Sequence, residues 1–344
     1  MRNKVLLITS RFGHLSDFFG LWWKSAARNL DFNFLILTDI DNIDSAENIF
    51  VKKYENFSSF ISQVDNKLKF KTKIQTPFKT ADLRPAYADI FENEINEVYK
   101  MRYGKSGSFD FWGYVDTDVV FGDLSKFVTD KNLDSCDVFQ TWGHFMLVRN
   151  NEMNKIIYKK KYRNYSFYRS IRLPENCMNE EGPFVLQLAN AGNRIDSKAT
   201  RVAGIRRDTF EYKIDSINYD EQKFVYIDGK VLRYFKYNNI INVDEFMYIH
   251  FMKRIIDDIP THKNGIVFEE NGFFEFNEES LFENRFSQDA YLKWQTYTSD
   301  TNEIRNNKVS ILYKLFHLEN YLYRRATRNI EAEKNDFLRK FYAE

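Results

Sequence analysis

Two short apolar segments, KVLLIT (residues 4–9) and FNFLILTD (residues 32–39), decide the fold of this chain. Each is a continuous apolar run that stops at polar residues, which is typical of a buried parallel strand that ends in a loop. Between them, residues 16–29 carry apolar side chains at helical spacing, with Ser16 or Asp17 as the N-cap. The first 40 residues therefore predict a β-α-β unit, the opening of an α/β fold with a doubly wound sheet.

The same patterns continue along the chain and extend the predicted sheet. Further strands are expected over residues 49–53, 109–115, 138–141 and 145–148, and helices over residues 57–69, 82–99, 151–161 and 183–191. Residues 162–182 are polar, aromatic and irregular, which is typical of a loop region over a site. The segment 200–251 holds short β-rich runs, and Asp228-Gly229 is a strong hairpin turn signal. After residue 275 charged helices follow, so we expect a catalytic domain over residues 1–275 and a C-terminal helical extension over residues 276–344.

The composition is that of a folded protein without a polyanionic partner. Of the 344 residues, 43% are hydrophobic and 17% aromatic, enough for a sizeable core. The net charge of +1 speaks against nucleic-acid binding, and two cysteines do not make a disulfide framework. The apolar run at the N-terminus is too short for a signal peptide, and no stretch is long enough to span a membrane. We therefore expect a cytoplasmic protein.

Polar residues at the ends of the first two strands are candidates for ligand contacts. In open α/β sheets, ligands bind outside the carboxyl ends of the strands, which makes Thr9 to Gly13 and Thr38-Asp39 candidate contacts by position, with Thr9 and Asp39 as the leading ones. The glycine pattern of a dinucleotide-binding loop is missing after the first strand. A single nucleotide held by side chains is therefore the better fit.

The acidic triplet Asp116-Thr117-Asp118 is the leading candidate for the chemistry. It follows an apolar strand, and its two carboxylates stand two residues apart, so both are able to turn to one side and share a divalent cation. A cation held there would bridge the two phosphates of a nucleotide diphosphate. Since the chain has 49 acidic residues, a chance pair without a metal is the alternative.

The triplet lies in a longer block that resembles a known family. The block FWGYVDTDVVFGDLSKF (residues 111–127) resembles the W-G-Y-x-D-x-D-x-x-x-G-D-x-x-x-F block of a bacterial glycosyltransferase family from capsule and surface-polysaccharide loci. Three further segments are similar to that family in the same order: KTADLRPAY (residues 79–87), GHFMLVRN (residues 143–150) and YIHFMKR (residues 248–254). The resemblance implies a GT-A fold, a mixed sheet with helices on both faces, and a nucleotide-sugar donor.

The resemblance also implies a metal centre with a late histidine. In related GT-A enzymes a histidine near the end of the domain completes the metal site, which points to Asp116, Asp118 and His250, and a nearby lysine, here Lys253, contacts the diphosphate. An imidazole beside two carboxylates favours Mn²⁺, with Mg²⁺ as the alternative. UDP is the expected nucleotide by analogy with other enzymes of this fold. A histidine satisfied within the core is the alternative for His250.

Asp82 and Arg84 are the candidates on the donor side. They stand at the start of a predicted helix near the ligand edge of the sheet, where a guanidinium neutralises phosphate and an aspartate orients it or accepts from a ribose. Asp116 is expected near the ribose as well. A local cap and ion pair is the alternative for the Asp82 and Arg84 side chains.

The acceptor side rests on three residues. His144 follows the triplet at the distance where GT-A proteins build this side, and structural hydrogen bonding is its alternative. The family carries an acidic pair near the position of Glu180-Glu181, although the flanking residues here depart from its aromatic-Asp-Glu pattern. Glu181 is the expected general base of an inverting enzyme, and a solvated loop charge is the alternative.

The C-terminal helices carry leucines and arginines at helical spacing over residues 309–341. Such a basic amphipathic surface suits contact with anionic lipid at the inner face of the plasma membrane, and packing on the chain's own domain is the alternative. The predicted function is a metal-dependent transfer of a hexose from a UDP-sugar to a glycan acceptor, such as a lipid-linked oligosaccharide. Two other readings are a phosphohydrolase of the haloacid-dehalogenase type, with Asp116 as nucleophile, and a glycan-binding protein without turnover.

Overall fold

The computed structural model describes residues 1–15, 18–162, 165–196, 202–205, 212–214, 219, 221–251, 265–269, 272–278 and 281–282. Of the expected C-terminal extension it describes residues 276–278, 281 and 282, so the helices expected there lie outside the described residues. The expected N-cap at Ser16 or Asp17 and the expected phosphate contact Lys253 also lie outside them.

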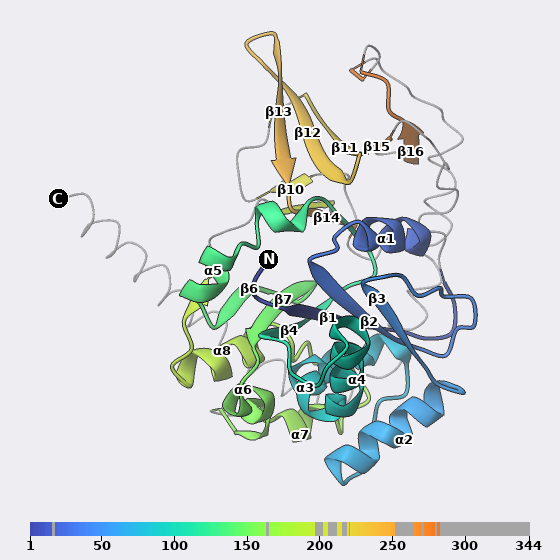
Figure 1. The fold of residues 1–344 in the computed structure, drawn as a ribbon, viewed down its shortest axis with the longest axis vertical. Helices are drawn as coiled ribbons and strands as arrows, with labels where there is room; N and C mark the ends of the chain where they lie inside the picture. Colours follow the sequence, from blue (N-terminus) through green and yellow to red (C-terminus); the bar gives the residue numbers. More distant parts are fainter. Residues whose placement is uncertain are drawn as a thin grey trace, which may run out of the picture.

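A seven-stranded sheet forms the centre of the molecule (Figure 1). Its strands are β1 (Val5–Arg11), β2 (Phe32–Thr38), β3 (Ile49–Lys53), β4 (Phe111–Val115), β6 (Val138–Trp142), β7 (Phe145–Arg149) and β8 (Ile195–Asp196). In the order β3-β2-β1-β4-β7-β6-β8, the first four strands run parallel, β7 is antiparallel to both of its neighbours, and β8 is parallel to β6. The predicted α/β class is confirmed as a mixed, largely parallel sheet with helices. Because β1 to β4 are parallel, their carboxyl ends meet at one edge.

Helices cover both faces of this sheet. Side chains alternate along each strand, so Leu6 and Ile8 enter one buried cluster while Val5 and Leu7 enter another. The second cluster contains α1 (Phe18–Ala27), the short 3₁₀ turn η2 (Leu124–Lys126) and α5 (Asp130–Ser135). The first face carries α2 (Phe57–Leu68), η1 (Pro77–Ala86), α3 (Tyr87–Ile90), α4 (Glu92–Tyr103), α6 (Glu152–Ile156), η3 (Ile157–Lys159), α7 (Phe167–Ser170) and α8 (Gly182–Asn190).

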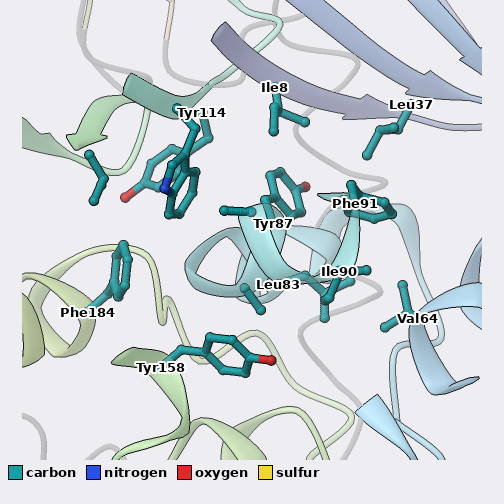
Figure 2. Close-up of a cluster of buried hydrophobic side chains, with 14 of the residues drawn as sticks. Ile8, Leu37, Val64, Leu83, Tyr87, Ile90, Phe91, Tyr114, Tyr158 and Phe184 are labelled. Carbon is teal, nitrogen blue, oxygen red and sulfur yellow. The ribbon is translucent and has the colours of Figure 1, made fainter. Parts of the chain in front are cut away.

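The single helix expected over residues 82–99 is wrong in its first part. The chain forms the 3₁₀ segment η1, then the short α3, and begins α4 only at Glu92. Pro85 lies inside η1 and has no N–H to donate to an α-helical ladder. Figure 2 shows Leu83 and Tyr87 packed below Ile8 of β1. Both side chains are fully buried, at roughly 1.5–3 kcal/mol for each large apolar group, and this packing anchors Arg84 between them.

Two smaller sheets complete the described fold. A four-stranded sheet has the order β10-β9-β14-β5, and a five-stranded antiparallel sheet has the order β13-β12-β11-β15-β16. The hairpin turn predicted at Asp228-Gly229 is confirmed, since both residues have positive φ between two paired strands. The strands are β5 (Val119–Phe121), β9 (Val202–Ile205), β10 (Tyr212–Ile214), β11 (Gln222–Ile227), β12 (Lys230–Tyr237), β13 (Ile240–Phe246), β14 (Tyr248–His250), β15 (Ile266–Glu269) and β16 (Gly272–Glu275).

Candidate metal centre

Asp116, Asp118 and His250 come together in one group, which we call the metal group. One ligand atom from each of the three lies within 4.8 Å of the others. Nε2 of His250 is 3.3 Å from Oδ1 of Asp118 and 3.7 Å from Oδ2 of Asp116. The histidine is 9% exposed and both carboxylates are partly exposed, so an ion is able to reach them from solvent. Two carboxylate oxygens and one imidazole nitrogen form a donor set that can hold a divalent cation.

The backbone around the acidic triplet is fixed from several sides. The triplet lies between β4, which belongs to the large sheet, and β5, which pairs with β14 so that His250 stands opposite Val119. The main-chain N–H of Phe251 donates to the carbonyl of Asp118 at 2.8 Å. Nε1 of the buried Trp22 donates to the carbonyl of Asp116 at 3.0 Å. The switch from one sheet to the other therefore places the histidine on the two carboxylates.

Arg84 links the group to a neighbouring hairpin. Nη2 of Arg84 donates to Oδ1 of Asp116, and Nη1 donates to the carbonyl of Gly143 at 2.6 Å. Nη1 also lies 3.9 Å from Oε1 of Glu180. Burial by itself lowers the pKa of the guanidinium, but the carboxylates of Asp116 and Glu180 outweigh it and raise that pKa. Arg84 is therefore a permanent charge that holds one oxygen of Asp116 and leaves Oδ2 toward His250.

The hairpin between β6 and β7 brings His144 and Glu181 to the same place. The ring of His144 lies 4.1 Å from the ring of His250, measured between centroids, and its Nδ1 is 3.0 Å from the hydroxyl of Tyr248. The main-chain N–H of Asp116 donates to the carbonyl of His144 at 3.1 Å. A Cβ atom added at Gly143 would lie 2.8 Å from Oε1 of Glu181, so a side chain at this position would displace the carboxylate. The acceptor-side candidates therefore surround one turn next to the metal group.

The chain matches one protein family over most of its length. Residues 7–277 match the Family of unknown function (DUF6625). The chain belongs to this family. Searches of curated proteins and of solved structures found no match. Among the described residues, no helix is both long and apolar enough to cross a lipid bilayer.

Asp82 of this DUF6625 chain is buried behind the metal group. Its side chain is 0% exposed, and its two oxygens accept from Nζ of Lys79 at 2.8 Å and from the main-chain N–H groups of Cys177 and Asn179 at 2.8 and 3.1 Å. Lys79, itself 1% exposed, also donates to the carbonyls of Ser170 and Glu175. Asp82 therefore ties the loop before α8 to η1 and pairs with Lys79 rather than with Arg84, and its role on the donor side stays a prediction.

Glu180 is the least satisfied carboxylate of the site. It is 5% exposed, and its Oε2 has no hydrogen-bond partner among the described residues. Burial raises the pKa of this carboxyl to about 8, although Arg84 acts in the opposite direction. The hydroxyl of Tyr114 donates to its main-chain carbonyl at 2.6 Å, which fixes the backbone. Burial therefore favours the protonated form of Glu180, and the neighbouring Arg84 favours the charged form.

Thr9, within β1, and Asp39, directly after β2, both lie at the carboxyl edge of the sheet but have different surroundings. Thr9 is 3% exposed within β1. Asp39 follows β2, and its Oδ1 accepts the main-chain N–H of Gly13 at 2.8 Å. Gly13 has a φ of 84°, which glycine adopts more readily than other residues. Asp39 therefore shapes the loop after β1, and a ligand contact through Thr9 or Asp39 stays a prediction.

Proposed function

We propose that this protein is a metal-dependent glycosyltransferase of the GT-A type, which moves a hexose from a UDP-sugar to a glycan acceptor such as a lipid-linked oligosaccharide of bacterial surface-polysaccharide synthesis. The observation that carries the proposal is the group of Asp116, Asp118 and His250. It lies at the carboxyl edge of parallel strands, where open α/β sheets bind ligands. The same three residues follow from the family resemblance, which supports a catalytic metal rather than a chance acidic pair.

On the donor side, each residue of the group has a separate role in this proposal. Asp118 and His250 are the direct ligands of Mn²⁺, with Mg²⁺ as the weaker alternative because it prefers oxygen ligands. Asp116 shares one oxygen with Arg84 and turns the other toward His250, so it supplies a single oxygen to the cation or to the ribose. When bound, the cation neutralises the charge that develops on the leaving diphosphate.

On the acceptor side, His144 and Glu181 flank the turn at Gly143. In an inverting reaction Glu181 takes the proton of the attacking acceptor hydroxyl, and His144 contacts the acceptor sugar. Glu180 supplies the second polar group of this side and holds Arg84 through Oε1. Asp82 has a positioning role, because its oxygens already accept three internal hydrogen bonds.

Thermal unfolding with UDP, GDP and CMP, each with and without Mn²⁺, tests the proposal. UDP with Mn²⁺ should stabilise the protein by about 2.7 kcal/mol at 100 times its Kd, and neither should do so alone to the same extent. Asp118→Ala should remove the effect, while Asp31→Ala, which removes the same charge at the opposite edge of the sheet, should keep it. Transfer from a UDP-sugar, measured as UDP release, should show the same pattern.

Three outcomes would contradict the proposal. If none of the nucleotides stabilises the protein, it is not a nucleotide-sugar transferase. Release of inorganic phosphate from a sugar phosphate would favour the phosphohydrolase. Stabilisation by oligosaccharides alone, without UDP release, would favour a glycan-binding protein.

A further inference from the structure

Arg11 lies level with the acidic triplet on the neighbouring strand. It is the last residue of β1, which pairs in parallel with β4 so that Val5 stands opposite Phe111 and Ile8 opposite Tyr114. β4 ends at Val115 and the triplet follows it directly, so Arg11 and the triplet lie at the same carboxyl edge, at the ends of two neighbouring strands. Its guanidinium interacts electrostatically with Asp118.

The guanidinium of Arg11 is partly buried, and among the described residues the carboxylate of Asp118 acts on it electrostatically without forming a salt bridge. Its Nε donates to the carbonyl of His14 at 2.8 Å, which orients the side chain and leaves the two terminal nitrogens for other contacts. No carboxylate oxygen of the described residues forms a salt bridge with it. Burial lowers its pKa, and the carboxylate of Asp118 only partly offsets this effect. A cation that is desolvated without a counter-ion is costly, so such a site favours an anionic ligand.

Arg84, on the other side of the triplet, differs from Arg11 because its terminal nitrogens already donate hydrogen bonds within the protein. Its terminal nitrogens are used by Asp116 and by the carbonyl of Gly143. A ligand phosphate would have to compete with these contacts to reach Arg84, whereas Arg11 has donors to offer. The sequence places Arg11 within the stretch of candidate ligand contacts after the first strand but gives it no separate role, because one arginine at a strand end belongs to no motif and its role depends on which strand lies beside it.

We propose that Arg11 binds the phosphate oxygens of a diphosphate ligand through its two terminal nitrogens, on the side of the metal group away from Arg84. A planar guanidinium makes two parallel hydrogen bonds to phosphate, which lysine cannot reproduce. This inference deepens the proposed function and rests on it in naming the ligand as the diphosphate of a nucleotide-sugar. A diphosphate attached to a lipid acceptor has the same chemistry, so the experiment separates the sources.

Isothermal titration calorimetry at constant Mn²⁺ concentration tests this role, with UDP, inorganic pyrophosphate and uridine as ligands. Arg11→Gln should weaken the binding of UDP and of pyrophosphate by roughly 10- to 100-fold, the effect of losing hydrogen bonds to a charged group. Uridine, which has no phosphate, should bind both proteins alike. Mn²⁺ alone should bind Arg11→Gln at least as tightly as the native protein, because Arg11 is no metal ligand and its positive charge lies near Asp118.

Two further variants make the comparison strict. Arg11→Lys should recover only part of the UDP affinity. Arg28→Gln removes the same charge beyond the far end of α1 and should leave every affinity unchanged. Unfolding curves show whether Arg11→Gln is folded, and if it is not, Arg11→Lys carries the test, with a loss of UDP affinity expected and equality with the native protein overturning the role.

The outcomes separate this inference from the proposed function. If the native protein binds UDP with Mn²⁺ and Arg11→Gln binds it equally well, the role of Arg11 is overturned and the proposed function stands. If the native protein binds pyrophosphate but not UDP, and Arg11→Gln loses pyrophosphate, the anion role stands and the nucleotide proposal fails. A loss of affinity for UDP but not for pyrophosphate would also overturn it, by placing Arg11 on the nucleoside. Binding of neither ligand overturns both.

Discussion

Two basic residues of η1, Lys79 and Arg84, each form an ion pair. The two pairs differ in how completely their charges are compensated within the protein. Lys79 and Asp82 are enclosed, and the carboxylate accepts three internal hydrogen bonds. Arg84, by contrast, faces the carboxylate of Asp116, which belongs to the group with Asp118 and His250, and the carboxyl of Glu180, whose pKa burial raises. The first pair balances its charge within the protein, and the second adjoins a group of side chains that could hold a divalent cation. Proximity in sequence thus says little about role, and local charge balance says more.

The largest effect is expected at the enclosed pair. Lys79→Met would leave Asp82 buried without its counter-ion, which costs about 3–5 kcal/mol of unfolding free energy. Urea unfolding measures this loss. Lys159→Met breaks a pair with the half-buried Asp89, in which the lysine is 42% exposed, and should cost about 1 kcal/mol or less. If folded Lys79→Met protein also lost its Mn²⁺ affinity, the two pairs would not be separable as described.

The next prediction is that the free energy of unfolding depends on pH through Glu180, which lies beside Arg84. Burial raises the pKa of Glu180 from 4.5 to about 8, so the folded protein keeps a proton that the unfolded chain has released. Stability should therefore fall as pH rises from about 4.5 to about 8, by up to roughly 1.4 kcal/mol for each pH unit. In Glu180→Gln this decline should be absent.

Urea unfolding at a series of pH values shows the contrast between the native protein and Glu180→Gln. The exposed variant Glu55→Gln should follow the native curve. A parallel decline in the native protein and in Glu180→Gln would mean that Glu180 is not the group responsible.

The smallest effect concerns the bond that ties η1 to the sheet. Oγ of Ser10, on β1, lies 2.8 Å from Oγ1 of Thr80 and 3.1 Å from the hydroxyl of Tyr87. Ser10→Ala should cost about 0.5–1.5 kcal/mol, the typical contribution of such a hydrogen bond, and should leave Mn²⁺ affinity unchanged. Thermal unfolding compares it with Ser62→Ala on the exposed side of α2, which should be close to neutral. A change in Mn²⁺ affinity would show that this tie positions the metal group.

The sequence predicts those parts of the molecule that depend on local pattern. The runs around Leu6 and Leu35 predict the parallel strands, and the family resemblance predicts the group of Asp116, Asp118 and His250 that the structure also brings together. The closed surroundings of Asp82 depend on the main-chain N–H groups of Cys177 and Asn179, far along the chain. No local pattern reports such partners, and the same holds for Arg11.

The break of the expected helix at residues 82–99 has a different cause. Proline is tolerated in the first turn of an α-helix, so the sequence pattern predicts one helix over residues 82–99 in spite of Pro85. The chain instead forms a 3₁₀ segment that contains Pro85, since Leu83 and Tyr87 pack below β1 with the spacing that this segment provides. Tertiary packing therefore overrides the local preference.

The pairing of β14 with β5 sets when the metal group forms during folding. His250 meets Val119 only after the chain between them has closed into a loop, and such distant contacts form slowly. The large sheet draws its strands from residues that precede β9, so an intermediate that contains this sheet alone holds both carboxylates but not the imidazole. Metal that binds only the completed group should slow unfolding while leaving the early refolding rate unchanged. Binding of Mn²⁺ would thus report whether β14 has paired with β5.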